Sequence, residues 1–140
     1  MYRQFIWTEE HSVGVAEFDE QHKHFFDICN DLFDLAIGAT FSKEAMLVKV
    51  AQLGSYANYH LFTEEELFEK IKYPGSAEHT KEHDMFRAKV RDFIDRSRDD
   101  TTDLQKLSRE VAEFAAGWLF DHILFMDKKY TKFFNEHGIK

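Results

Sequence analysis

The chain has 140 residues, of which 44% are hydrophobic and 31% charged, a composition typical of one globular domain with its own core. Its formal net charge is −8, and without a lysine or arginine cluster it offers no surface suited to nucleic acid. The longest apolar run, Phe114 to Phe120, is shorter than the ~20 residues that cross a bilayer. The N-terminus lacks the apolar region of a secretory signal, and the single Cys29 cannot form an intrachain disulfide. We therefore expect a soluble, cytoplasmic protein without membrane insertion, and no protein partner is indicated.

Two helices are predicted in the first half of the chain, after an N-terminal arm. Residues 1–17 show no sustained periodicity and are predicted to form the arm. From residue 18 to residue 36, apolar positions recur at helical spacing, and Gly38 follows as a plausible C-cap. The second helix is predicted from about Ser42 to about Lys72, before the breaker pair Pro-Gly.

The second half of the chain predicts two more helices. Ser76 is a good N-cap residue for the third, with Glu78 in its first turn. The polar run RSRDDTTD separates the third helix from the fourth, where Thr102 and Gln105 have the spacing of a capping box. Apolar positions then continue at helical spacing to Phe125.

These elements predict an all-α fold. Short loops favour antiparallel neighbours, so we expect an up-down-up-down four-helix bundle over about residues 18–127. The arm at residues 1–17 and a short C-terminal helical tail at residues 128–140 complete a single domain spanning residues 1–140.

The second predicted helix carries polar side chains in a stripe that should face the core. Two of these positions are His60 and Glu64, one turn apart, whereas Glu65, Glu66 and Glu69 are expected to face water. The stripe advances in alternating steps of four and three residues through Met46, Val50, Leu53, Ala57, His60, Glu64, Leu67 and Ile71.

Every other predicted helix has a similar anomaly in its apolar stripe. The residues concerned are His22 in the first helix, His79 and His83 in the third, and His122 in the fourth. Those of the first and third helices lie near helix starts, and those of the second and fourth near helix ends. In an antiparallel bundle these starts and ends meet, so the topology brings the polar groups to one level of the core.

A metal site explains this convergence better than isolated ion pairs or core histidines do. Each unpaired buried polar group costs about 1–3 kcal/mol, and several would rival the ~5–15 kcal/mol by which domains are stable. Hydrogen bonds among these groups would relieve part of the cost, and a metal would do so more completely. Five histidines with a carboxylate exceed the needs of one tetrahedral zinc, so two metals sharing a carboxylate fit better. Imidazole and carboxylate ligands leave iron, zinc, copper and nickel open.

Four segments of the sequence resemble the hemerythrin family, specifically its bacterial hemerythrin-like members. They are WTEEHSVGVAEFDEQHKHFF around His22, YHLFTEEELF around His60, YPGSAEHTKEH around His79 and His83, and WLFDHILFMDKKY around His122. They span Trp7 to Tyr130 in the order and spacing of that family.

The resemblance implies a non-haem di-iron centre with two iron ions and an oxygen-derived bridge. The two-histidine iron would keep an open position, at which dioxygen would bind. The implied ligands are His79, His83 and His122 on one iron, His22 and His60 on the other, and Glu64 and Asp127 bridging both.

The implied oxygen pocket consists of apolar side chains near these ligands. Trp118, Leu119 and Ile123 match family pocket positions, and Phe25, Phe26 and Phe62 are further candidates. By the same resemblance, the function is reversible dioxygen binding for oxygen transport, storage or delivery, not enzymatic catalysis. The alternatives are an oxygen or redox sensor, or a di-iron enzyme that acts on peroxide or nitric oxide.

Helical periodicity alone does not predict Asp127 as a ligand. It follows His122 by five residues, about 140° around an ideal helix and off the shared face. We therefore expect a departure from regular helical hydrogen bonding near Phe125 and Met126, either a π-bulge or a helix end. The remaining histidines, His11, His24 and His137, are expected to lie outside the site.

Overall fold

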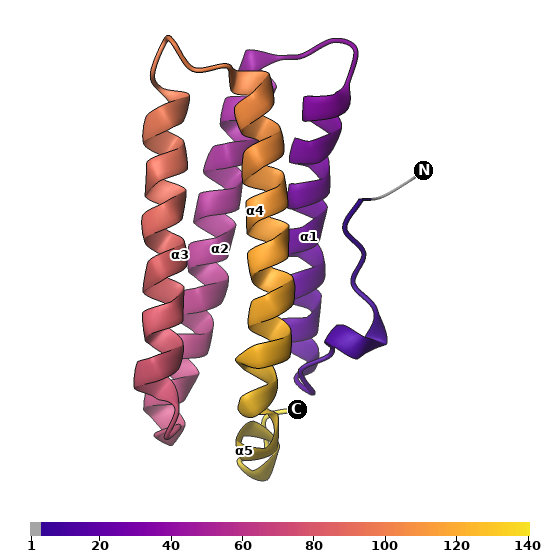
Figure 1. Ribbon diagram of the computed structural model, residues 1–140. Coiled ribbons are helices and arrows are strands. Elements are labelled where there is room, and N and C mark those ends of the chain that lie inside the picture. Colours follow the sequence, from indigo (N-terminus) through magenta and orange to yellow (C-terminus); the bar gives the residue numbers. More distant parts are fainter. Residues whose placement is uncertain (1–3) are drawn as a thin grey trace.

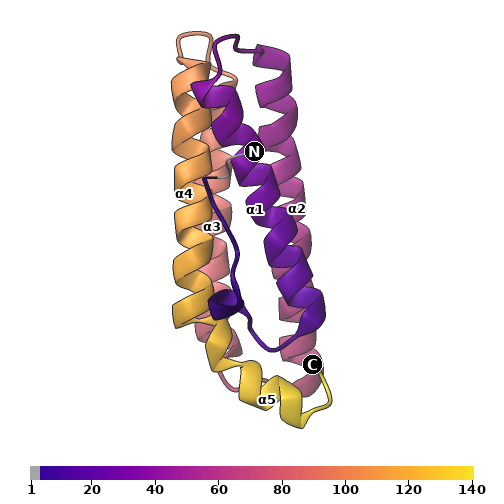
Figure 2. The ribbon, with the colours of Figure 1, turned by 90° about the vertical axis from the view of Figure 1, so that its right-hand side faces the viewer.

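The computed structural model describes residues 4–140, so the first three residues of the predicted arm lie outside the described part. Within residues 4–140 every regular element is a helix, which confirms the all-α prediction. The four long helices pack as an antiparallel up-down-up-down bundle (Figures 1 and 2). None of the helices in the described range combines the length and apolar content that crossing a membrane requires. In chain order the elements are the 3₁₀ helix η1 (Glu9–His11), α1 (Ala16–Ile37), α2 (Lys43–Ile71), α3 (Ser76–Ser97), α4 (Leu104–Phe125), the 3₁₀ helix η2 (Asp127–Lys129) and α5 (Thr131–Glu136).

Backbone geometry at the helix ends corrects two predicted caps. The N-cap of α3 is Gly75, and Ser76 is already the first helical residue. The N-cap of α4 is Asp103, whose carboxylate accepts the backbone N–H of Lys106 at 3.1 Å, rather than Thr102. An ionised carboxylate is a favourable group at the positive end of a helix, which explains why Asp103 fits this position.

The end of α4 departs from regular helical geometry, as expected, and the second of the two alternatives is the one found. The helix ends at Phe125, and Met126, at φ −119° and ψ −57°, leads into η2. The N–H of Met126 still donates to the carbonyl of His122 at 2.8 Å, so the change of direction comes just after this bond. The turn places Asp127, fully buried, inside the bundle.

Hydrogen bonds fix the arm to the bundle and the tail to the arm. The backbone N–H of Phe5 donates to Asn30 Oδ1 at 2.9 Å, and Asn30 Nδ2 donates to the carbonyl of Phe5 at 2.8 Å. At the other end of the arm, Thr131 Oγ1 donates to the carbonyl of Val13 at 2.5 Å. Figure 2 shows the arm beside α1 and α4, with α5 crossing the end of the bundle where α1 begins. Arm and tail therefore close this end.

Glycines within α2 and α4 offer a matched test of packing. Glycine inside a helix is about 1 kcal/mol less favourable than alanine. A Cβ at Gly117 would meet nothing within 4 Å, whereas one at Gly54 would lie 3.3 Å from Val90 Cγ1. We therefore expect Gly117→Ala to raise the free energy of unfolding by about 0.5–1 kcal/mol in urea denaturation. Gly54→Ala should raise the free energy of unfolding by less, because the side chain of Val90 must shift to make room. Equal increases for the two variants would contradict this packing.

Candidate metal centre

The polar residues singled out in the sequence meet at the end of the bundle that the arm and tail close. Their ligand atoms form two groups, and within each group the atoms lie within 4.8 Å of one another. All seven side chains belong to residues that are at most 4% exposed. The first group contains Glu64, His79, His83, His122 and Asp127, and the second contains His22, His60, Glu64 and Asp127.

The helices bring these side chains together in the way the antiparallel topology requires. His22 and His79 lie near the starts of α1 and α3, whereas Glu64 and His122 lie near the ends of α2 and α4. Asp127 reaches the same level from η2, through the turn at the end of α4. Two successive turns of α3 contribute His79 and His83 from one face.

Each of the two carboxylates lies against histidines of both groups. For Asp127, Oδ1 is 3.0 Å from His79 Nε2 and 3.1 Å from His122 Nε2, and Oδ2 is 3.3 Å from His22 Nε2. Glu64 Oε1 is 3.3 Å from His83 Nε2 and 3.4 Å from His60 Nε2. The two groups of ligand atoms are therefore joined through both carboxylates.

The residues fit a pair of cations better than they fit one another. Glu64 Oε1 and both carboxylate oxygens of Asp127 are buried without a hydrogen-bond partner, although imidazole nitrogens lie about 3 Å away. The histidine Nε2 atoms crowd together as well, with 3.0 Å between those of His22 and His60 and 2.9 Å between those of His79 and His122. Carboxylate oxygens without hydrogen-bond partners, beside closely spaced imidazole nitrogens, are the donor set of a metal centre.

The charges of the site depend on burial and on neighbouring ionised groups. Burial lowers the pKa of His60 to about 3, with only partial opposition from Glu64, so this imidazole is neutral. Burial also opposes charge on His83, but the ionised carboxylates of Glu64 and Glu65 beside it outweigh burial and raise the pKa of His83 to about 9. Burial alone would raise the pKa of Asp127, yet the charge of His122 and the imidazoles of His22 and His79 beside it hold this pKa well below its ordinary value. The carboxylate of Asp127 is therefore an ionised ligand.

A surrounding set of hydrogen bonds orients the histidines. His60 Nδ1 donates to Gln21 Oε1 at 2.5 Å, and His83 Nδ1 donates to Glu65 Oε2 at 2.7 Å. Once a metal binds, the remaining ring proton lies on Nδ1 and the Nε2 lone pair points into the centre, which is how carboxylate and amide groups orient metal-bound histidines. Arg87 in turn donates to both oxygens of Glu65, at 2.8 and 3.0 Å. Tyr130 donates its phenol proton to Glu64 Oε2 at 2.6 Å.

Sequence reasoning missed these supporting residues and misplaced one of them. Glu65 was expected to face water, but it is half-buried because α3 lies beside it and supplies both His83 and Arg87. Gln21 directly precedes His22, and Tyr130 ends one of the family-like segments, so adjacency to a predicted ligand was the available signal. Helical periodicity does not identify which residue meets a neighbouring helix.

The structure separates the candidate oxygen-pocket residues into two sets. Trp118 is partly buried and its ring stacks on His122 with 4.4 Å between centroids. Phe62 does not belong to the pocket, because it is 55% exposed on the outer face of α2. It follows His60 by two residues, and this spacing turns the side chain to the opposite side of the helix. The buried candidates, all at most 1% exposed, are Phe25, Phe26, Leu119 and Ile123.

The other histidines lie outside the two ligand groups. His24 is exposed, with its ring 4.4 Å from that of Tyr56. His11 packs on Phe120 with 4.8 Å between centroids, and His137 is exposed on the tail.

Comparisons with known proteins identify the class. Residues 13–134 match the family model described as "Hemerythrin HHE cation binding domain". The chain is 29% identical over 128 residues to a bacteriohemerythrin of Clostridium acetobutylicum, covering 90% of this chain and 98% of the relative. It is also 29% identical over 126 residues to a hemerythrin-like protein of Naegleria gruberi, covering 90% of each. A crystal structure of wild-type hemerythrin superposes with a TM-score of 0.84 at 28% identity, covering 92% of this chain and 96% of that one.

Fold and ligand groups together define a metal-binding helical bundle. The chain belongs to the hemerythrin family, because the family model covers most of its length. It is accordingly a hemerythrin-type metal-binding protein.

The hydrogen bond from His83 to Glu65 should contribute to metal affinity. Loss of such an orienting partner typically weakens metal binding about 10- to 100-fold. We expect Glu65→Ala to do so in competition with a metal chelator at pH 7. The matched control is Glu66→Ala, which removes an exposed carboxylate one position along the same helix. Equal affinities for the two variants would show that Glu65 does not support the centre.

Metal uptake should release a proton from His83. With its pKa raised to about 9, this imidazole is protonated in the metal-free chain at pH 7.5, and it must be neutral to bind a metal. The apparent metal affinity should therefore rise with pH up to about 9, by about tenfold per unit for one proton. His60, with its pKa lowered to about 3, releases none in this range. Calorimetric titrations in two buffers of different ionisation enthalpy measure the proton, and heats independent of the buffer would contradict its release.

Proposed function

We propose that the chain binds dioxygen reversibly at a non-haem di-iron centre and serves as an oxygen carrier, store or delivery protein. The observation that carries this proposal is that Glu64 and Asp127 each lie against histidines of both groups, an arrangement suited to two neighbouring cations. Iron accepts imidazole and carboxylate donors, and two iron ions with an oxo or hydroxo bridge would supply the electrons that dioxygen takes up and gives back.

The seven side chains would divide unequally between the two ions. The group on α1 and α2 has one histidine fewer than the group on α3 and α4, so we propose that dioxygen binds on the α1–α2 side. Glu64 and Asp127 would be shared by both ions, with His79, His83 and His122 on one and His22 and His60 on the other.

The apolar side chains around the centre would keep water away from bound dioxygen. Phe25 and Phe26 on α1, with Leu119 and Ile123 on α4, are almost completely buried. Phe18 lies on the α1–α2 side, with its ring centroid 5.7 Å from that of His60. A dry pocket favours release of dioxygen intact, because water that entered would compete for its position and promote irreversible oxidation.

A di-iron enzyme acting on peroxide or nitric oxide is the second candidate. Tyr130 supports it, because a buried phenol that donates to Glu64 is placed to deliver a proton to the centre. A sensor is the third role that the same centre would permit. Carriage is preferred over these because burial raises the pKa of the Tyr130 phenol well above its ordinary value, so this group retains its proton.

Metal analysis with absorption spectroscopy through one cycle of anaerobic reduction, air and argon tests the proposal. We expect two irons per chain and a charge-transfer band that appears in air and fades under argon. Iron that oxidises once and does not return would overturn reversible carriage and favour the enzyme or the sensor. Zinc or copper in place of iron would exclude the di-iron centre.

A further inference from the structure

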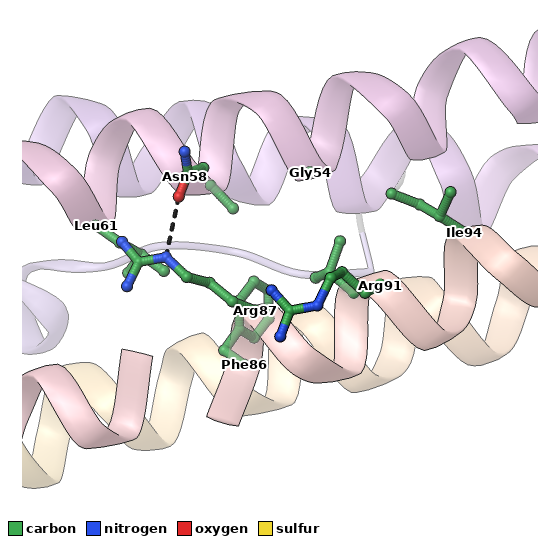
Figure 3. A pocket seen from close by; sticks show the side chains of 9 residues that line it. Gly54, Asn58, Leu61, Phe86, Arg87, Arg91 and Ile94 are labelled. Carbon is green, nitrogen blue, oxygen red and sulfur yellow. Dashed lines mark hydrogen bonds between the residues drawn. The ribbon is translucent and has the colours of Figure 1, made fainter. Parts of the chain in front are cut away.

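A groove of about 300 Å³ lies between α2 and α3. Figure 3 shows its lining residues, with α2 on one side and α3 on the other. The groove is mostly apolar inside, and the residues that matter for its shape are Gly54, Ala57 and Leu61 on α2 and Phe86, Val90 and Ile94 on α3.

Small residues on α2 create the groove. Gly54 and Ala57 lie on one face of α2, one turn apart, and leave space opposite the side chains of α3. A Cβ at Gly54 would lie 3.3 Å from Val90 Cγ1 and 3.7 Å from Ile94 Cδ1, so even a methyl group would narrow the groove.

The floor of the groove leads towards the ligand histidines through apolar side chains. Leu61 is 0% and Phe86 1% exposed, although both line the groove. Leu61 directly follows His60 on α2, and Phe86 lies one turn beyond His83 on α3.

A second hollow lies between α3 and α4, has a volume of about 210 Å³ and is lined by Glu82, Asp121 and His122 among others. Both hollows are mostly apolar inside, and both have charged residues in their lining, Arg87 and Arg91 in the groove between α2 and α3. They differ in where they lead. Leu61 of the groove directly follows His60, a ligand of the two-histidine group, whereas the second hollow opens on His122 of the three-histidine group.

We propose that dioxygen reaches the metal centre through the groove between α2 and α3, passing between Leu61 and Phe86. This inference rests on the proposed function, and it adds the route by which the ligand arrives. Arg87 fixes the width of the groove at the end nearest the centre, since its Nε donates to Asn58 Oδ1 on α2 at 3.0 Å (Figure 3). The same guanidinium holds Glu65, so the route and the orientation of His83 share one anchor.

Occupancy of the groove is tested with xenon, an inert gas atom that enters dry apolar cavities. Methyl NMR spectra of the full chain under xenon pressure should show shifts for Leu61, Val90 and Ile94 before other methyl groups. Gly54→Ala should reduce these shifts, and Gly117→Ala should leave them unchanged because a Cβ there meets nothing within 4 Å. Xenon shifts that bypass these three residues would overturn the proposal.

The route itself is tested by the rate at which the reduced, iron-loaded chain reacts with dioxygen in stopped flow. Gly54→Ala narrows the groove and should slow the reaction several-fold. Val90→Ala widens it and should accelerate the reaction, and a change of stability alone would not produce such opposite effects on the rate. Rates that match wild type in both variants would overturn the route, as would equal slowing by Gly117→Ala.

Failure of the route and failure of the carrier function give different results. If argon does not reverse the reaction but its rate still follows the width of the groove, the route stands and reversible carriage fails. If argon reverses it and the rate ignores Gly54 and Val90, carriage stands and the route is wrong.

Discussion

The structure depends on two ionised carboxylates buried inside a ring of five histidines. An uncompensated charge in a protein core costs several kcal/mol, so Glu64 and Asp127 are tolerable only with favourable partners on every side. The imidazoles supply part of this compensation, and the orphaned oxygens of both carboxylates mark where cations belong. The antiparallel order of the four helices meets this need, because it places two helix starts and two helix ends at one level.

The C-terminal segment is part of the centre rather than an appendage. The end of α4 at Phe125 turns Asp127 inward, and Tyr130, three residues later, donates to Glu64. The ring of Tyr130 stacks on Phe134 of α5 with 4.3 Å between centroids, so the short helix that crosses the end of the bundle also holds the phenol in place. Arm and tail bond to each other at Thr131 and Val13, and together they separate the centre from water.

The interface of α2 and α3 contains both the hydrogen bonds that orient His83 and the groove proposed as the route for dioxygen. Arg87 neutralises Glu65, Glu65 fixes the proton of His83, and the same arginine binds Asn58 across the interface. An apolar groove beside such a tether gives a small uncharged molecule a way inward while the tethered helices stay packed. A buried centre that is dry and reachable is what reversible binding of a small gas molecule requires, and it links the proposed function to the proposed route.

The sequence alone determined the four helices and the level at which their polar side chains meet. Periodicity of 3.6 residues fixes the inward face of each helix, and the chain order fixes which ends are adjacent, so His22, His60 and Glu64 were placed without coordinates. Tertiary structure alone decided which residues meet across helices, such as Glu65 with His83, and it moved Phe62 out of the pocket. Asp127 was suggested by family resemblance, but only the turn after α4 places it inside the bundle. A local sequence pattern specifies which face of a helix is buried. Side-chain contacts between helices depend on how closely the neighbouring helices pack and on where each helix ends.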